Sequence, residues 1–155
     1  MAEPPLDEVN RAIIQALQAD ARGRSSTAIA DVVGISDSAV RKRIARLEDA
    51  GIIRGYHADV NYQAAGFPLR MLLYCTAPID QRAVKGAQIL QIQGVVRVQE
   101  LLTGDRNLLV TVVGQTDADI TSVARSIVEL GVTVADEVLV RSTAMTPFDG
   151  FEPNG

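Results

Sequence analysis

The most chemically suggestive stretch of the sequence is a short cluster of positive charges with no acid between them. Within six residues the chain places four basic side chains: Arg41, Lys42, Arg43 and Arg46. Ammonium and guanidinium groups bind phosphate oxygens, and a guanidinium can also contact the edge of a base. A cluster of this composition is therefore typical of a surface that binds nucleic acid.

A helix is needed to bring these side chains to one face, and the apolar spacing around them predicts one. Val40, Ile44 and Leu47 recur at the spacing of a helical stripe that packs on a core. When that stripe is turned inward, the outward residues are Ser38, Ala39, Lys42 and Arg46.

The place of each residue along this helix predicts its role on DNA. Ser36 is positioned to cap the helix, and Ser38 and Ala39 stand near its start, where base edges are usually contacted. Lys42 and Arg46 follow one and two turns later, where we expect phosphate contacts.

Two further arginines lie outside this face. Arg41 is on a flank and could contact either a base or a phosphate. Arg43 lies about 70° from the core stripe, so we expect it to be partly buried against an acid such as Glu48 or Glu8. The alternative is a solvated charged face on a three-helix bundle, and the outward Asp49 would repel phosphate.

The segments before this helix have the pattern of a helix-turn-helix. A first helix is predicted over Leu6–Ala19 with Asp7 as its N-cap. A second, short helix starts at a cap within Ser25–Thr27 and ends at Gly34. Its expected inward residues are Ile29, Val32 and Val33. The third helix, which carries the basic cluster, ends at Gly51.

The second half of the chain alternates strands and helices. The expected elements are strand Leu69–Ala77, helix Asp80–Ile92, strand Val95–Thr103, strand Leu108–Val113, helix Asp117–Leu130 and strand Val132–Met145. This βαββαβ order predicts a ferredoxin-like sandwich. The fold class is therefore α+β, with a DNA-binding domain and extended linker at residues 1–60 and a second domain at residues 61–155. The tail from Pro147 is expected to be loose.

Both faces of the predicted strands carry apolar residues. Leu72 and Tyr74 alternate with Leu73 and Cys75, although helices can cover only one face of the sheet. We therefore expect residues 61–155 to dimerise through the other face, even without the DNA-binding half.

The composition excludes several classes of protein. Apolar residues make up 47% and charged residues 22%, which argues against disorder, and the sequence contains neither a membrane span nor a signal pattern. We therefore expect a cytoplasmic protein. The net charge of −4 is unusual for a DNA-binding protein, so any basic surface must be local. The single cysteine, Cys75, and single histidine, His57, provide no disulfide, metal cluster or catalytic set, and no cofactor is expected.

The chain resembles the Lrp/AsnC, or feast/famine, family of transcription regulators. The matching stretches are Leu6-Asp7, Ile13-Ile14, Leu17, Asp20–Arg22, Ile29-Ala30, Val33–Ser36, Val40–Glu48, Gly51–Tyr56, Gly94-Val95, Thr103–Asp105 and Gly131-Val132. They span about residues 6–145, and the run through Gly55-Tyr56 is the most specific part.

This resemblance implies a winged-type helix-turn-helix joined to a βαββαβ module called the RAM domain. Family members build dimers that often close into octamers, and they bind palindromic double-stranded DNA. Small effectors, commonly amino acids, bind where dimers meet, beside the loop after the second strand and the end of another subunit's last strand. In this chain the resemblance places that loop at Gly104, Asp105, Arg106 and Asn107.

The chain departs from the family in that loop and in one other. The loop before the second helix carries one extra residue around Gly23-Arg24, which we expect to be harmless. The family commonly has Gly-Asp-aromatic-Asp where this chain has Gly104–Asn107, so a carboxylate is replaced by a neutral amide. We expect Asn107→Asp to strengthen amino-acid binding and Asp105→Asn to weaken it. The alternative is that this segment only makes a hairpin turn.

Other functions remain as alternatives. An effector-independent DNA-binding regulator or an architectural protein would need only the first domain. A small enzyme on the ferredoxin-like module is disfavoured, because His57 lies outside that module and no catalytic set is visible. An RNA-binding sandwich is disfavoured because the middle strands lack paired aromatic residues.

Overall fold

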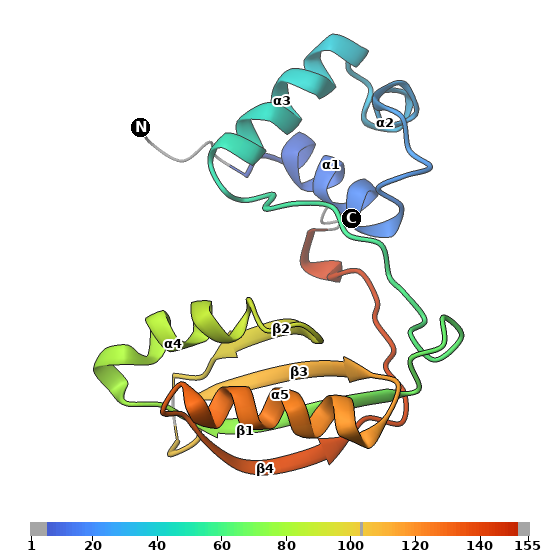
Figure 1. Cartoon of the computed structure of the whole chain (residues 1–155). Coiled ribbons are helices and arrows are strands. Elements are labelled where there is room, and N and C mark those ends of the chain that lie inside the picture. The colour runs from blue at the N-terminus through green and yellow to red at the C-terminus, as the bar shows by residue number, and fades with distance from the viewer. Residues whose placement is uncertain (1–5, 103, 152–155) are drawn as a thin grey trace. The chain divides into compact units, whose positions relative to one another are not determined.

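The chain forms two compact units in the computed structural model, which describes residues 6–102 and 104–151. One unit combines Met1–Ala58 with Ala144–Gly155, and the other is Asp59–Thr143. The polypeptide therefore passes between the two units twice, once before residue 59 and once after residue 143. We call them the helical unit and the sheet unit (Figure 1).

The helical unit contains α1 (Glu8–Ala19), α2 (Ser26–Val33) and α3 (Asp37–Asp49). Each helix begins at a side chain that accepts a hydrogen bond from a backbone N–H in the first turn. The caps are Asp7, Ser25 and Ser36, which bond the N–H groups of Asn10, Ala28 and Ala39. The predicted caps at Asp7 and Ser36 are confirmed. They were predictable because a cap depends on residues close to it in the sequence.

The turn between α2 and α3 depends on Gly34, which adopts the left-handed conformation with φ 76°. Its N–H bonds the carbonyl of Ala30 and closes the helix. The prediction that Val32 points inward is wrong, since it is 68% exposed. Ile29, Ala30 and Val33 share the inward arc, and Val32 falls about 110° from its centre at 100° per residue.

The core of the helical unit is small and aliphatic. Its buried residues are Ile13, Ile14, Ala16, Ile29, Ala30, Val40 and Leu47. The short 3-10 helix η2 (Asp149–Phe151) packs Phe151 against this cluster, and Arg11 donates to the Gly150 carbonyl. The expectation of a loose tail is wrong at least for Asp149–Phe151, because one aromatic side chain finds an apolar surface on α1. The tail from residue 152 lies outside the described residues.

The sheet unit has the predicted βαββαβ order. Its elements are β1 (Leu69–Thr76), η1 (Ile79–Gln81), α4 (Arg82–Ile89), β2 (Val95–Glu100), β3 (Leu108–Gly114), α5 (Asp117–Glu129) and β4 (Thr133–Leu139). The four strands are antiparallel in the order β2-β3-β1-β4. This is the ferredoxin-like sandwich.

Several element ends differ from the prediction. The first predicted helix of the sheet unit is divided into η1 and α4, and α4 ends earlier than expected. The strands β2 and β4 are also shorter than expected, because they end at Glu100 and Leu139. Thr103, the predicted end of β2, lies outside the described residues. Element ends are decided by tertiary pairing, which apolar spacing alone does not report.

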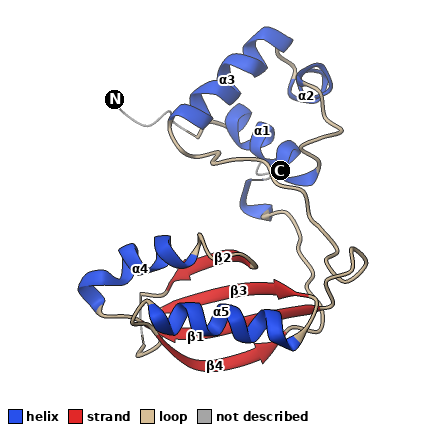
Figure 2. Cartoon of the chain, viewed as in Figure 1, coloured by secondary structure: helices blue, strands red, loops and turns tan. Residues whose placement is uncertain are grey.

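Both long helices of the sheet unit lie on one face of the sheet (Figure 2). Leu73 and Cys75 of β1 and the β3 residues Leu108, Val110 and Val112 point to that face and are buried with α5. Burial raises the pKa of the Cys75 thiol to about 11, with a smaller contribution from Glu137. Cys75 therefore behaves as the small buried hydrophobe expected from the sequence.

We call the opposite face of the sheet the open face. Its residues are those that alternate along each strand with the residues of the buried face. In the row across its centre, Leu72 pairs with Thr111 on one side and Val138 on the other. Val138 is 41% exposed. In the next row Tyr74 pairs with Leu109 and Asp136.

Two negative findings concern the described ranges 6–102 and 104–151. No helix there is long and apolar enough to cross a membrane. The same residues hold no group of three or more histidine, cysteine or acidic side chains that could bind a metal ion.

Candidate nucleic-acid interface

The exposed face of α3 carries the side chains that the sequence assigned to DNA. Ser38, Lys42 and Arg46 are exposed and Ala39 is half-buried beside them. Lys42 and Arg46 form no ion pair or side-chain hydrogen bond with any residue that the structure describes. Both cations are therefore available to an anionic partner.

The start of α3 presents two hydroxyl groups. Ser36 caps the helix by accepting the Ala39 N–H at 3.2 Å, and its Oγ lies 3.2 Å from that of Ser38. Both residues are exposed. The positive end of the helix dipole lies at the same place, so an anionic or acceptor group can approach it.

Arg41 lies on the flank as expected but is paired within its own helix. Its guanidinium contacts the Asp37 carboxylate at 2.6 Å, one turn earlier, with the Arg41 side chain 66% exposed. An exposed pair at this spacing contributes only a few tenths of a kcal/mol. Arg41 can therefore exchange Asp37 for a phosphate at little cost.

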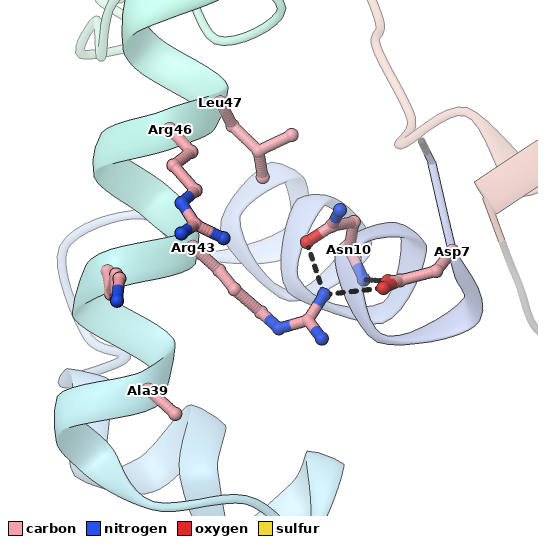
Figure 3. A pocket seen from close by; sticks show the side chains of 7 residues that line it. Asp7, Asn10, Ala39, Arg43, Arg46 and Leu47 are labelled. Carbon is pink, nitrogen blue, oxygen red and sulfur yellow. Dashed lines mark hydrogen bonds and ion pairs between the residues drawn. The ribbon is translucent and has the colours of Figure 1, made fainter. Parts of the chain in front are cut away.

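Arg43 makes the longest-range contact of the cluster. It donates to the carboxylate of Asp7, the N-cap of α1, at 2.6 Å and to the amide oxygen of Asn10 in α1 at 2.9 Å (Figure 3). The expectation that Arg43 is partly buried against an acid is confirmed, but the acid is Asp7 and neither Glu48 nor Glu8, because the way α3 crosses α1 sets the direction of the Arg43 side chain. The hydrogen bond from Arg43 is the main cause that lowers the pKa of Asp7.

Glu48 has a different partner. It accepts the Tyr56 hydroxyl at 2.8 Å. Burial raises the pKa of Tyr56 to about 12, and the bond to Glu48 adds to the shift. This contact ties the segment after α3 back onto the helix.

A cavity of about 260 Å³ opens between α1 and α3 next to the exposed cations. Its lining includes Ala39, Lys42, Arg43 and Arg46, and Figure 3 shows Arg46 on the α3 side with Arg43 spanning to α1. Since Arg43 neutralises Asp7, the remaining charge is positive. The site is suited to hold a phosphate group beside the helix.

The second predicted site, Gly104–Asn107, is largely engaged within the chain. The Asp105 carbonyl accepts the Thr76 hydroxyl at 2.9 Å, while Gly104 and Asp105 are exposed. Arg106 pairs with Asp136 at 3.1 Å and lies 5.7 Å from the centre of the Tyr74 ring.

Asn107 is buried, and both ends of its amide are used. Its Oδ1 accepts the Ala77 N–H at 2.9 Å and its Nδ2 donates to the Ala77 carbonyl at 2.7 Å. This pair of bonds closes the end of β1 onto β3. In this structure the Asn107 amide therefore serves as an internal brace and does not face an effector. The residues next to Asn107 along the chain do not reveal this contact, because Ala77 is 30 residues away.

The sequence matches a known DNA-binding family over the helical part. Residues 6–54 match the family described as winged helix-turn-helix DNA-binding. The chain is 34% identical over 119 residues to the HTH-type transcriptional regulator AldR of Mycobacterium tuberculosis. The alignment covers 76% of this chain and 66% of AldR, about two thirds of that protein's length.

Solved structures agree along nearly the whole chain. The crystal structure of M. tuberculosis AldR has a TM-score of 0.73 at 28% identity, covering 90% of this chain and 97% of AldR. A feast or famine regulatory protein from M. tuberculosis complexed with L-methionine has a TM-score of 0.76 at 24% identity, covering 91% and 95%. A Neisseria meningitidis transcriptional regulator in complex with L-methionine has a TM-score of 0.75 at 23%, covering 92% and 96%.

The last two likenesses are below 25% identity and show the fold alone, whereas the alignment with AldR reaches 34% identity over 119 residues. The relatives of this chain, AldR and LrpA of M. tuberculosis among them, are HTH-type transcriptional regulators, which is the class that the sequence predicted. The exposed basic face of α3, the βαββαβ sheet unit and these matches together show that the chain belongs to the Lrp/AsnC family of DNA-binding transcriptional regulators.

Proposed function

We propose that the chain recognises a double-stranded operator by laying α3 in the major groove. The observation that carries this proposal is the set of exposed, unpaired cations on α3, Lys42 and Arg46, behind a capped helix start. Ser38 and Ala39 would meet base edges, and Lys42, Arg46 and Arg41 would contact phosphates. Ser36 would keep its capping bond and place the helix start against the backbone.

We also propose that the regulator works as a homodimer built through the open face of the sheet. That face carries Leu72, Tyr74, Leu109 and Val138, and α4 and α5 cover only the other side. A second copy would remove these side chains from water. Two α3 helices related by a two-fold axis would match a palindromic operator, and further assembly to an octamer follows the family pattern.

An amino acid is the proposed effector. Two of the similar regulators hold L-methionine in their structures. In this chain the Gly104–Arg106 segment offers backbone N–H groups, the exposed Asp105 and the Arg106 guanidinium as partners for a zwitterion.

An effector-independent regulator is the second candidate. It is favoured by the inward Asn107 and by the pairing of Arg106 with Asp136, because both side chains are engaged within the chain and Asp105 is then the charged side chain of residues 104–107 left for a ligand. In that case the loop is a turn and DNA affinity is the same with or without amino acids.

The test is selection of duplexes from a random-sequence pool by the purified chain, followed by fluorescence anisotropy on the enriched duplex. We expect affinity to fall steeply between about 0.05 and 0.3 M salt, as phosphate contacts require. Repeating the titration with each standard L-amino acid separates the two candidates. Failure to enrich any duplex would refute operator binding, whereas identical affinities with all amino acids would favour the effector-independent regulator.

A further inference from the structure

The cavity between α1 and α3 contains one carboxylate beside the cations that we assign to DNA. Asp7, Lys42 and Arg46 all line this cavity of about 260 Å³. The Asp7 side chain is 43% exposed, so burial does not shield its charge. A free carboxylate at this place would oppose DNA in two ways. It would repel a phosphate group nearby, and it would pair with a cation that the phosphate needs.

Both oxygens of the Asp7 carboxylate are occupied by donors of the helical unit. Oδ2 accepts from Arg43 Nη1 at 2.6 Å, and Oδ1 accepts the Asn10 backbone N–H at 2.7 Å. The same Arg43 nitrogen also donates to the Asn10 side-chain oxygen at 2.9 Å (Figure 3). The bond from Arg43 is the main cause of the lowered pKa of Asp7, as expected for a carboxylate that is paired while charged.

Arg43 differs in this respect from the two cations beside it on α3. Its side chain is 31% exposed and directed towards α1, whereas Lys42 and Arg46 are exposed. Neither of those two forms an ion pair within residues 6–102 and 104–151. The cavity is lined by three cations and one carboxylate, and the pair of Arg43 with Asp7 leaves two cations without a carboxylate partner.

We propose that Arg43 is a positioning residue for DNA binding, which occupies the Asp7 carboxylate and thereby keeps Lys42 and Arg46 available to phosphates. The inference rests on the proposed DNA contacts of α3 and assigns no DNA contact to Arg43 itself. Arg43 acts through Asp7. It removes a competing acceptor for the two cations and a charge that repels the DNA backbone.

Two other roles for Arg43 predict different behaviour. An arginine that contacts a phosphate directly contributes about one unit to the salt dependence, whether or not Asp7 is charged. An arginine that only holds α3 against α1 shares that role with Asp7, so loss of either partner weakens DNA binding. Occupation of Asp7 alone predicts that removing the Asp7 charge restores binding when Arg43 is absent.

The test is a double-mutant cycle on the DNA affinity of the complete chain. The four proteins are the parent, Arg43→Gln, Asp7→Asn and the double variant. Asparagine keeps the N-cap of α1, because its side-chain oxygen accepts the same backbone N–H. Fluorescence anisotropy measures binding to the enriched duplex and to a duplex of unrelated sequence, which is held by phosphate contacts.

The matched control is a second arginine–carboxylate pair in the sheet unit. Arg82 contacts the Glu100 carboxylate at 3.1 Å and also donates to the Leu101 carbonyl, and the exposed fractions of the pair are 24% and 45%. Arg82→Gln and Glu100→Gln therefore change the same kinds of groups away from α3. We expect both control variants to bind DNA as the parent does.

Arg43→Gln should weaken binding to both duplexes about fivefold, which is the upper end of what an exposed ion pair contributes. Asp7→Asn should bind at least as tightly as the parent. The double variant should return to within about twofold of the parent, with the same salt dependence.

A double variant that binds as weakly as Arg43→Gln would overturn the proposal, and a salt dependence reduced by about one in both would identify a direct phosphate contact. Equal losses in Asp7→Asn and Arg43→Gln would leave only the structural role. Thermal unfolding of the four proteins tests the bond without DNA, and purely additive effects on stability would also overturn the proposal. A parent chain that binds neither duplex would instead refute the proposed function on which this inference rests.

Discussion

In the helical unit the side chains expected to contact DNA stay exposed, whereas in the sheet unit the side chains expected to contact an effector are mostly engaged inside the chain. Lys42 and Arg46 project from α3 without partners among the described residues, while Asn107 is buried against Ala77 and Arg106 is paired with Asp136. A DNA-binding surface is positioned by one helix. A small-molecule pocket is built from several segments, so the residues that line it often also form the contacts that hold those segments together.

The largest expected effect tests whether Asn107 is an internal brace. Asn107→Asp removes the donor to the Ala77 carbonyl and places a carboxylate 2.7 Å from that oxygen. We expect the free energy of unfolding to fall by about 3 kcal/mol, because the new carboxylate is buried and faces the Ala77 carbonyl oxygen, which cannot donate a hydrogen bond to it. This opposes the expectation from family resemblance that Asn107→Asp strengthens effector binding.

Urea unfolding measures that change. The neighbouring exposed Asp105→Asn is the control and should change stability by less than about 0.5 kcal/mol. An Asn107→Asp variant as stable as the parent, with tighter amino-acid binding, would remove the contrast between the two units.

The next effect concerns the open face. Leu72→Glu puts a charge at the centre of the proposed dimer contact, where burial requires its desolvation. We expect the dimer dissociation constant to rise about a hundredfold, or about 2.7 kcal/mol. Sedimentation velocity over a concentration series measures it, with Val128→Glu on exposed α5 as the control. A parent chain that sediments as a monomer at micromolar concentration would refute dimerisation through this face.

A smaller effect is expected for each phosphate contact on α3. Lys42→Ala and Arg46→Ala should each weaken operator binding about tenfold, or 1.4 kcal/mol, and reduce the slope of log affinity against log salt by about one. Arg125→Ala removes an arginine from the sheet unit and should leave the slope unchanged. Unaltered slopes in both α3 variants would mean that these cations do not contact phosphate.

The smallest effect concerns the bond between Asp7 and Arg43. Because Arg43 holds the pKa of Asp7 below its ordinary value near 3.8, the pair stabilises the helical unit above that pH. The contribution is lost as pH falls through the lowered pKa, when the carboxylate is protonated. Asp7→Asn should cost under about 1 kcal/mol at pH 7, since the pair is partly exposed.

Stability of the parent, Asp7→Asn and the exposed control Glu8→Gln is compared by thermal unfolding from pH 7 to pH 2.5. The difference between parent and Asp7→Asn should shrink below about pH 4. A constant difference across this range would show that the Asp7 charge is not what stabilises the fold.

Features that depend on contacts between residues close in the sequence could be predicted, whereas features that depend on contacts between distant residues could not. The helix caps at Asp7 and Ser36 and the left-handed Gly34 depend on residues within a few positions, so they were predictable. The βαββαβ order of the elements along the chain was predictable from the apolar patterns of the strands and helices. The partner of Arg43 is 36 residues away and that of Asn107 is 30 away. Such contacts depend on how elements cross, which local spacing does not encode.

The packing of Phe151 on α1 has a consequence for synthesis on the ribosome. The three helices are complete by Asp49, but this aromatic side chain, which packs against their core, is made about a hundred residues later. At typical translation rates that delay is roughly 5 to 20 s, during which the whole sheet unit is also made. The three helices therefore emerge before Phe151 is made, so the nascent helical unit lacks this aromatic contact until residue 151 has left the ribosome.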